Sequence, residues 1–394
     1  MKKLVSFVLV MLLTISLAGC GSTKEKSASN IKVGFIFIGD ENEGYTAAHY
    51  NGAKEMQKAL GLKDNQLIVK WTIKEDEGAY DAAVDLVDQG CNIIFANSFG
   101  HEPYMIQAAK EFPDVQFCHA TGAGAASSGC KNMHNYFTNV YESRYVSGVV
   151  AGMKLNEMIE QGKITPEEAV MGYVGAYPYA EVISGFTSFY LGAKSVCPSV
   201  TMKVTYTNSW ADMSLEQEAA NSLIANKCVL ISQHADTTGA PTACEAAGVP
   251  CVGYNVDMIP VASNTALTSA SINWAPYYTY AVQCVLDKKD IDVDWCQGYK
   301  EGADKITELN KNAIAEGTEA KVAEVEAAIK DGSLKVFDTS TFTIGGSSLE
   351  DLVASDPDNY GAAKDLISGG YYHESEQKSA PSFGFIIDGI TAVE

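Results

Sequence analysis

The strongest constraint on the fold is a repeated alternation of short apolar runs with longer amphipathic stretches. The runs at 31–38 and 92–97 are rich in β-branched and aromatic residues, as expected of buried strands. The stretches that follow them, 45–60 and 103–111, place apolar residues at helical spacing. Because helices that connect parallel strands lie on the faces of the sheet, this alternation predicts an α/β protein built on parallel sheets.

The same alternation continues along the rest of the chain. We expect a long amphipathic helix at 141–160 to open a second unit that repeats the pattern of the first. The other expected strands are 66–72, 115–120, 169–175, 202–208, 228–234, 250–255 and 266–273, and the other expected helices are 80–89, 183–195, 215–226, 275–287 and 321–329. A chain of 394 residues has room for two domains of about 150 residues each. We therefore expect two α/β lobes, with a ligand cleft at the carboxyl ends of their strands.

The first thirty residues predict export and lipid attachment. A basic start precedes the apolar run Leu4–Leu17, which is too short to span a bilayer comfortably. The run ends in Leu17-Ala18-Gly19-Cys20, which resembles the lipobox where a bacterial signal peptide is cut before the cysteine and that cysteine receives a lipid. We expect residues 1–19 to be removed, Cys20 to carry the lipid, and residues 20–30 to tether the protein to the outer face of the cytoplasmic membrane. An uncleaved anchor helix is the weaker alternative, since it does not explain the small residues and the cysteine at that spacing.

Apart from Cys20, nine cysteines stand singly along the chain. They are Cys91, Cys118, Cys130, Cys197, Cys228, Cys244, Cys251, Cys284 and Cys296. An odd and dispersed set is not the pattern of a disulfide framework, so we interpret most of them as small buried apolar residues. The sequence leaves open one or two disulfides, with Cys118 and Cys130 as the nearest pair. With His119 and His134 these two also suggest a metal site, but neighbouring residues of a strand face opposite ways and no C-x2-C spacing occurs, so we expect no metal.

The charge of the chain limits its partners. It has 28 Lys and Arg against 49 Asp and Glu, a formal net charge of −21. An acidic surface repels phosphate backbones and anionic lipid headgroups, so we expect neither nucleic acid nor a membrane surface as a partner. The single arginine, Arg144, falls in the expected helix 141–160, where we expect it to bridge structural elements and not to contact ligand. Because arginine is the usual partner of carboxylate and phosphate groups, its scarcity favours a neutral, hydroxylated ligand.

Aromatic, Asp and Asn side chains gather in the loops that follow the expected strands. Each of them alone is commonly a helix cap or a turn residue. Found together at strand ends in both lobes, they favour a binding cleft, because aromatic faces stack on rings while carboxylates and amides accept hydrogen bonds. The candidate ligand-binding residues are Asp40, Asn42, Tyr45, Ser98, Phe99, Thr121, Tyr177, Trp210, Asp236, Asn255 and Asp257.

Signals of catalysis or of a cofactor are weak in this sequence. There is no G-x-S-x-G motif, and Gly122-Ala123-Gly124 has neither the lysine of a P-loop nor the spacing of a dinucleotide fingerprint. We therefore expect no enzyme and no cofactor. A Cys/His or paired-carboxylate site assembled from distant parts of the chain stays open.

Several motifs resemble one known family. Residues 44–52, Gly-Tyr-Thr-Ala-Ala-His-Tyr-Asn-Gly, are similar to the G-W-T-x-x-H-x-x-G stretch that follows the first strand in the Basic Membrane Protein family of ABC-transporter substrate-binding lipoproteins. The resemblance continues in order at 135–137, 141–145, 172–176, 207–210, 233–236, 253–258 and 273–278. It spans the chain from residue 31 to about residue 340.

The resemblance implies a type I periplasmic-binding-protein fold, in which two Rossmann-like lobes are joined by a three-strand hinge. It also implies a purine nucleoside or nucleobase as ligand and an ABC permease as partner, and we expect a monomer. The first lobe is then expected at 31–140 plus about 262–295, and the second at 141–261 plus about 296–345, with a C-terminal extension at 346–394.

The resemblance also assigns site residues. Tyr45 stands where family members have a ring-stacking tryptophan, Trp210 stands at the second aromatic position, and Asp236, Asn255 and Asp257 match polar positions that face the cleft. The chain departs from the family's nucleoside receptors at 40–43, Asp-Glu-Asn-Glu, where these often have paired aspartates followed by Lys-Ser-Phe-Asn. This departure and the smaller ring at position 45 leave nucleoside against free base open, and purine against another ring.

Other functions fit parts of the same evidence. A monosaccharide or another polyol is the alternative ligand of the same fold, since Asp, Asn and Trp also recognise sugars. Two further alternatives are an extracellular hydrolase that acts on nucleosides and a surface adhesin without a small-molecule ligand.

Overall fold

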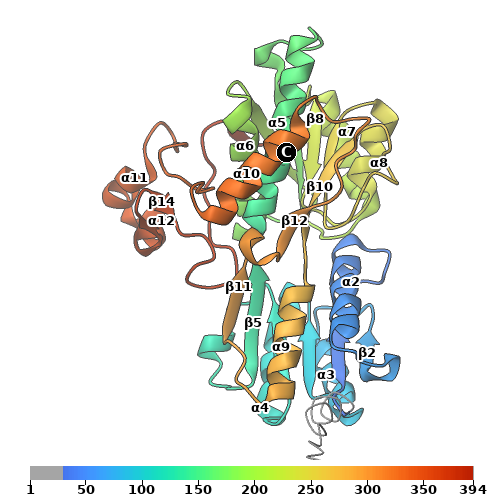
Figure 1. Cartoon of the computed structure of the whole chain (residues 1–394). Helices are drawn as coiled ribbons and strands as arrows, with labels where there is room; N and C mark the ends of the chain where they lie inside the picture. The colour runs from blue at the N-terminus through green and yellow to red at the C-terminus, as the bar shows by residue number, and fades with distance from the viewer. Residues whose placement is uncertain (1–29, 394) are drawn as a thin grey trace, which may run out of the picture.

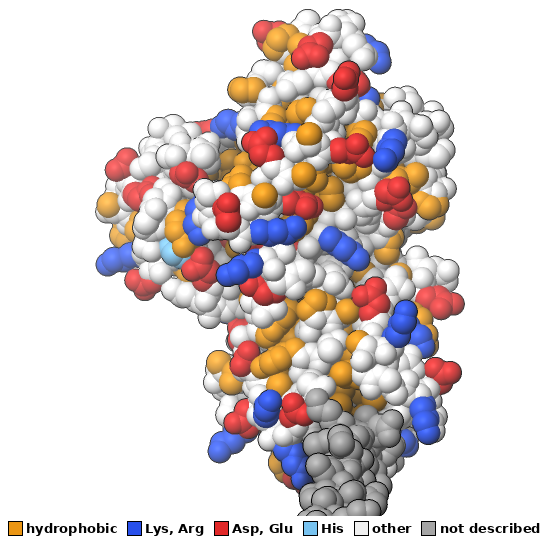
Figure 2. Space-filling model, in the orientation of Figure 1, with side chains coloured by type: hydrophobic (Ala, Val, Ile, Leu, Met, Phe, Trp, Pro, Cys, Tyr) orange, Lys and Arg blue, Asp and Glu red, His pale blue; other side chains and the backbone are white. Residues whose placement is uncertain are grey.

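The computed structural model describes residues 30–393, which form two lobes, one above the other in Figure 1. The expected signal peptide, Cys20 and all but the last residue of the expected tether lie outside the described residues. No helix within 30–393 combines the length and the apolar character needed to cross a membrane. Acidic and basic side chains are interspersed over the face of both lobes that Figure 2 shows.

The first lobe is built on a six-stranded parallel sheet with the order β11-β5-β4-β3-β1-β2. Its strands are β1 (Val33–Ile36), β2 (Leu67–Lys70), β3 (Ile93–Ala96), β4 (Gln116–Ala120), β5 (Met133–Thr138) and β11 (Asp294–Gln297). Helices α2 (Gly44–Ala59) and α9 (Ala275–Asp287) cover one face, and α3 (Gly78–Asp88) and α4 (Glu102–Glu111) cover the other. Burial on both faces explains why the central strands β1 and β3 read as unbroken apolar runs.

The second lobe repeats this arrangement around a seven-stranded sheet with the order β12-β10-β9-β8-β6-β7-β15. Its strands are β6 (Val170–Gly175), β7 (Thr201–Tyr206), β8 (Leu230–Gln233), β9 (Cys251–Tyr254), β10 (Ala266–Ile272), β12 (Asp304–Ile306) and β15 (Ile390–Ala392). Only β12 runs antiparallel to its neighbour. Helices α5 (Val140–Glu160), α6 (Ala180–Val196) and α10 (Thr318–Asp331) pack on one side, and α7 (Met213–Ala225) and α8 (Gly239–Ala247) on the other.

Two glycines explain how closely α5 and α6 approach each other. A Cβ atom added at Gly148 would lie 2.0 Å from the carbonyl oxygen of Phe189, and one added at Gly192 would lie 2.0 Å from that of Tyr145. Any larger residue at either position would push the helices apart. This contact holds the long helix α5 firmly in the second lobe.

The chain passes between the two sheets three times, which confirms the expected three-connection hinge. The passages join β5 to α5, β10 to α9, and β11 to β12. The second passage comes later than the expected boundary near residue 262, because β10 still pairs with β9 in the second sheet. The predicted strands and helices of both lobes are otherwise confirmed, with ends that shift by a few residues.

The C-terminal segment is more than the surface extension expected for 346–394. Helices α11 (Leu349–Ser355) and α12 (Pro357–Tyr360) and the hairpin β13 (Ile367–Ser368) to β14 (Tyr371–Tyr372) do project from the second lobe, at the left of Figure 1. The end of the chain then returns, because β15 pairs with β7 and becomes the edge of the second sheet. Phe383 and Ile387 are buried in the same core as α5 and α6.

The cysteines within the described residues are all free, so the suggested bridge between Cys118 and Cys130 is not formed. Burial raises the pKa of the Cys118 thiol to about 12. His119 and His134 are hydrogen-bonded to backbone carbonyls of Ser98 and Asp292. Among residues 30–393, no three or more His, Cys, Asp or Glu side chains come together in a way that could hold a metal ion.

Candidate functional site

A cavity of about 110 Å³ lies between the two lobes, where the carboxyl ends of both sheets face each other. This volume is several times the roughly 10–15 Å³ that one water molecule needs on the same measure. The first lobe lines the cavity with Ile38, Gly39, Glu43, Tyr45, Asn97, Ser98, Phe99 and Thr121, and the second with Glu181, Trp210, Ala211, His234, Asp236 and Tyr254. Most of these residues stand in the loops that follow strands.

The ring of Tyr45 is fixed at the start of α2. Glu43 caps this helix, since its carboxylate accepts hydrogen bonds from the N–H groups of Tyr45 (2.7 Å) and Thr46 (2.9 Å). The Tyr45 hydroxyl donates to the carbonyl oxygen of Asn97 at 2.6 Å, and its ring lies edge-on to His49. The first lobe therefore presents an aromatic face whose position does not depend on a ligand.

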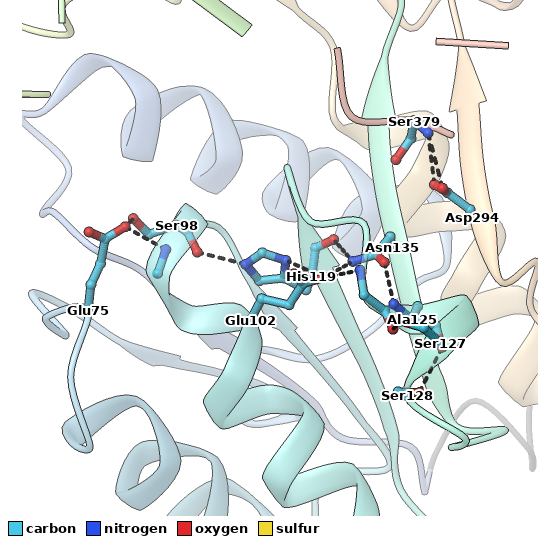
Figure 3. A network of polar contacts seen from close by, with 12 residues as sticks. Glu75, Ser98, Glu102, His119, Ala125, Ser127, Ser128, Asn135, Asp294 and Ser379 are labelled. Atoms are coloured by element: carbon cyan, nitrogen blue, oxygen red, sulfur yellow. Dashed lines mark hydrogen bonds and ion pairs between the residues drawn. The ribbon is translucent and has the colours of Figure 1, made fainter. Parts of the chain in front are cut away.

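The loop at Ser98 is held from two sides. One carboxylate oxygen of Glu75 accepts hydrogen bonds from the Ser98 hydroxyl and from the Gly100 N–H, both at 2.7 Å (Figure 3). Burial lowers the pKa of His119, so its imidazole is neutral, and its Nε2 lies 2.7 Å from the Ser98 carbonyl oxygen as the donor. These contacts fix the backbone on both sides of Phe99.

Thr121 has an unusual backbone and an unpartnered hydroxyl. Its φ angle is +68°, a value that β-branched residues rarely adopt. Its Oγ1 is buried and has no hydrogen-bond partner within residues 30–393. Strained backbones and orphaned polar groups tend to collect at ligand sites, because the surrounding fold must hold them there.

Trp210 lines the cavity from the second lobe and belongs to an aromatic cluster. Tyr177 packs edge-on against it, with ring centroids 5.2 Å apart, and Tyr179 stacks on Tyr177 at 5.2 Å. The Trp210 carbonyl oxygen accepts a hydrogen bond from the Asp236 N–H at 2.8 Å. Tyr177 therefore supports the cavity wall from behind and does not line the cavity.

Asp236 is a buried acid of the second lobe that lines the cavity. Its side chain accepts a hydrogen bond from the Asn255 amide at 2.7 Å, and its carbonyl oxygen accepts one across the cleft from the Gly44 N–H at 3.3 Å. Burial raises the pKa of Asp236 well above its usual value, and the carboxylates of Glu43, Glu216 and Glu181 raise it further. Asn255 stands behind Asp236 and orients it.

His234 and Glu181 form a second polar pair in the cavity wall. The His234 Nε2 lies 3.4 Å from a carboxylate oxygen of Glu181. Burial lowers the pKa of His234 to about 4, and the charge of Arg144 acts in the same direction. The imidazole is therefore neutral near pH 7 and donates to Glu181.

Arg144 has the structural role expected from its place in a helix. Its Nη1 donates to the carbonyl oxygen of Gln233 at 2.7 Å, and its guanidinium carbon lies 3.5 Å from the centre of the Tyr254 ring. It thereby joins α5 to β8 and β9 directly behind the cavity.

Six of the eleven predicted site residues line the cavity, namely Tyr45, Ser98, Phe99, Thr121, Trp210 and Asp236. Asp40, Asn42 and Asp257 are exposed and lie outside it, so the structure does not bring them together with the other predicted residues. Asp40 accepts a hydrogen bond from the Asn42 N–H, and Asp257 accepts one from the Ile259 N–H, so both are turn residues. Tyr177 and Asn255 lie one layer behind the lining residues.

The prediction missed eight lining residues. Glu43, Asn97 and His234 stand in the same strand-end loops as the predicted residues, so the signal was present in the sequence. Glu181 is in the first turn of α6 and Tyr254 is the last residue of β9, where no loop marks them. The others are Ile38, Gly39 and Ala211, which have no polar or aromatic group to single them out.

Comparisons with known proteins agree with this architecture. The family described as "ABC transporter substrate-binding protein PnrA-like" matches residues 31–336. A purine-binding protein of Brucella abortus (strain 2308) is 35% identical over 343 residues, which are 85% of this chain and 92% of that protein. A putative ABC transporter glucose-binding protein of Haloferax volcanii is 32% identical over 252 residues, 64% of this chain and 60% of that protein.

A solved structure gives the same result for the fold. An ABC transporter solute-binding protein from Aeropyrum pernix K1 superimposes with a TM-score of 0.65 at 15% identity, covering 86% of this chain and 98% of that one. At this identity the similarity establishes the two-lobe periplasmic-binding-protein fold alone.

Proposed function

The chain belongs to the PnrA-like family of ABC transporter substrate-binding proteins, and on that premise we propose that it binds a purine nucleoside or nucleobase between its lobes. Substrate-binding proteins of ABC importers work outside the cytoplasmic membrane and hand their ligand to a permease. The purine-binding relative in Brucella abortus supports the choice of ligand.

One observation carries the proposal. The rings of Tyr45 and Trp210 come from opposite lobes and line the same cavity as the carboxyl groups of Glu43, Glu181 and Asp236. A purine has flat faces that stack on aromatic rings and N–H groups at its edge that donate to carboxylates. The hydroxyls of a ribose would add further donors.

The charge of the cavity distinguishes nucleosides from nucleotides. No Lys or Arg is among the described residues that line it. With no cation in the lining, a phosphate would lose its hydration without gaining a charge partner, so the proposed ligand carries none. Adenosine monophosphate should therefore bind far more weakly than adenosine.

Isothermal titration calorimetry tests the proposal. The panel contains adenosine, guanosine, inosine, adenine, hypoxanthine, adenosine monophosphate, glucose and ribose. We expect one saturable site for at least one uncharged purine and no binding of the monophosphate. Saturable binding of sugars alone would refute the purine proposal and support the polyol alternative, which the glucose-binding relative of Haloferax volcanii favours.

The same samples separate the other functions. Inosine should be recovered unchanged after incubation with the protein, because we propose no catalysis. Release of hypoxanthine would indicate a nucleoside hydrolase. A protein that shows no thermal shift with any purine or sugar would fit an adhesin instead.

We also propose that Cys20 carries a lipid that holds the mature, monomeric protein at the outer face of the membrane. The support is the lipobox-like sequence at 17–20, which lies outside the described residues. In the native host, Cys20→Ala should abolish incorporation of a labelled fatty acid and release the protein from the membrane fraction. Labelling of the variant at the wild-type level would contradict the assignment.

A further inference from the structure

Two exposed aromatic rings from opposite lobes meet beside the cavity. Phe99 follows β3 and lines the cavity, while Tyr179 directly precedes α6. Their ring centroids are 5.9 Å apart and their planes are inclined by 29°, although the two residues are 54% and 46% exposed. We propose that Phe99 and Tyr179 form a gate that slows the exit of the ligand, and that Glu75 positions Phe99 in it. This inference rests on the proposed function.

The exposure of these rings points to a contact that forms and breaks. Large apolar side chains that remain exposed in the described chain are few, and two of them, Phe99 and Tyr179, lie against each other. Each ring belongs to a different lobe, so separation of the lobes exposes both faces to water and closure covers them again. The contact therefore favours the closed arrangement without touching the hinge.

The second lobe holds its half of the gate in place. Tyr179 stacks on Tyr177 at an angle of 12°, and Tyr177 packs edge-on against Trp210. An aromatic column thus runs from the cavity wall at Trp210 to Tyr179, and Phe99 completes it from the other lobe. Because the column is continuous, the position of Tyr179 is tied to that of a cavity-lining ring.

The first lobe holds its half through Glu75. Glu75 does not line the cavity, but its carboxylate accepts hydrogen bonds from the residues on both sides of Phe99, Ser98 and Gly100 (Figure 3). The fit is close, since a Cβ atom added at Gly100 would lie 2.6 Å from that of Glu75. Glu75 is therefore a positioning residue that acts through the Ser98–Gly100 loop.

Stopped-flow measurement of inosine dissociation tests the gate. Phe99→Ala and Tyr179→Ala should each raise the dissociation rate about 2- to 10-fold, the range of an aromatic pair, and change the association rate less. The double variant should be no faster than the faster single variant, because one contact is lost in all three. Tyr179→Phe keeps the ring and should therefore keep the slow dissociation rate of the wild type. Val293→Ala is the control, because Val293 is an exposed apolar residue far from this contact in the sequence.

The role of Glu75 has its own readout. Glu75→Ala should raise the dissociation rate in the wild-type background and should have no further effect in the Phe99→Ala background, whereas a merely structural role would act in both. The gate would be overturned if Phe99→Ala released inosine at the wild-type rate. It would also be overturned if the effects of Phe99→Ala and Tyr179→Ala on the dissociation rate were additive in the double variant.

A measurement without ligand separates failure of the gate from failure of the proposed function. If the wild type binds no purine of the ligand panel, the proposed function fails. Small-angle X-ray scattering of the ligand-free proteins then decides the gate, because Phe99→Ala and Tyr179→Ala should both increase the radius of gyration through a more open pair of lobes. Identical scattering curves for these variants and the wild type would overturn it.

Discussion

Both carboxylate oxygens of Asp294 lie 3.1 Å from the backbone nitrogen of Ser379 and accept its hydrogen (Figure 3). Asp294 begins β11 in the first lobe, whereas Ser379 belongs to the C-terminal segment that ends as β15 in the second lobe. The segment therefore connects the lobes at a point separate from the three hinge passages. It also lies beyond the family match, which ends at residue 336.

Loss of the Asp294 carboxylate should weaken this connection. A hydrogen bond to a charged group contributes about 1.5–3 kcal/mol, and the partial exposure of Asp294 places it at the lower end. We expect Asp294→Ala to lower the melting temperature by a few degrees and to open the ligand-free lobes in small-angle scattering. Asp294→Asn keeps an acceptor and should lower the melting temperature less. Asp290→Ala removes an exposed acid nearby in the sequence and is the control. Equal effects of Asp290→Ala and Asp294→Ala would contradict a role for the Ser379 contact.

Replacement of Trp210 tests the cavity directly. Trp210→Ala removes the aromatic face that the second lobe presents, and buried aromatic anchors of this kind often contribute about 2 kcal/mol or more to binding. We expect purine affinity to fall at least about 30-fold in titration calorimetry. Unchanged circular dichroism would show that the fold persists. Wild-type affinity in this variant would remove Trp210 from the site.

The Thr121 hydroxyl should affect stability and binding in opposite directions. Because its Oγ1 is buried without a partner among the described residues, Thr121→Val removes a desolvated polar group and should stabilise the ligand-free protein by about 1 kcal/mol. The same change removes a donor and acceptor from the cavity and should weaken purine binding about 5-fold. Both effects are measured by thermal unfolding and calorimetry.

Thr187 provides a matched control for that experiment. Its hydroxyl is also buried and unpartnered in the described part of the chain, but it lies on α6 and does not line the cavity. Thr187→Val should therefore raise the melting temperature and leave the affinity unchanged. A loss of affinity in Thr187→Val as large as in Thr121→Val would show that the binding effect is not local.

The fold was predictable from the sequence because its strands are buried on both faces. Runs such as 93–96 contain no polar residue, and a parallel sheet covered by helices on both faces buries such a run completely. Strand β5 was missed because His134 and Asn135 interrupt its apolar pattern. In the structure both side chains are hydrogen-bonded to residues distant along the chain, His134 to the Asp292 carbonyl oxygen and Asn135 to Glu102.

The candidate site was predictable only in outline. Strand ends mark the edge of the cleft, and the predicted residues Tyr45, Trp210 and Asp236 do line the cavity. The composition of a loop does not determine how far the loop turns toward the cleft. Asp40 and Asp257 were therefore predicted to bind ligand although they face solvent. Glu181 was missed because it lies in the first turn of a helix, where the sequence has no strand-end loop to mark it as a site residue.

Glu216 should make stability depend on pH. It is fully buried on α7, where its carboxylate oxygens accept the Thr237 N–H at 3.1 and 3.2 Å, and burial raises its pKa to about 7. The unfolded chain releases this proton near pH 4.3, so between about pH 4.3 and 7 the folded state holds more protons and loses stability as pH rises. Glu216→Gln does not titrate. The free energy of unfolding of this variant minus that of the wild type should therefore rise by on the order of 3 kcal/mol across this window and stay constant above it.

Urea unfolding from pH 4.5 to 8 measures the difference, with Glu218→Gln on the exposed face of the same helix as the control for loss of one charge. Curves for Glu216→Gln and wild type that run parallel across the window would show that Glu216 does not carry this dependence.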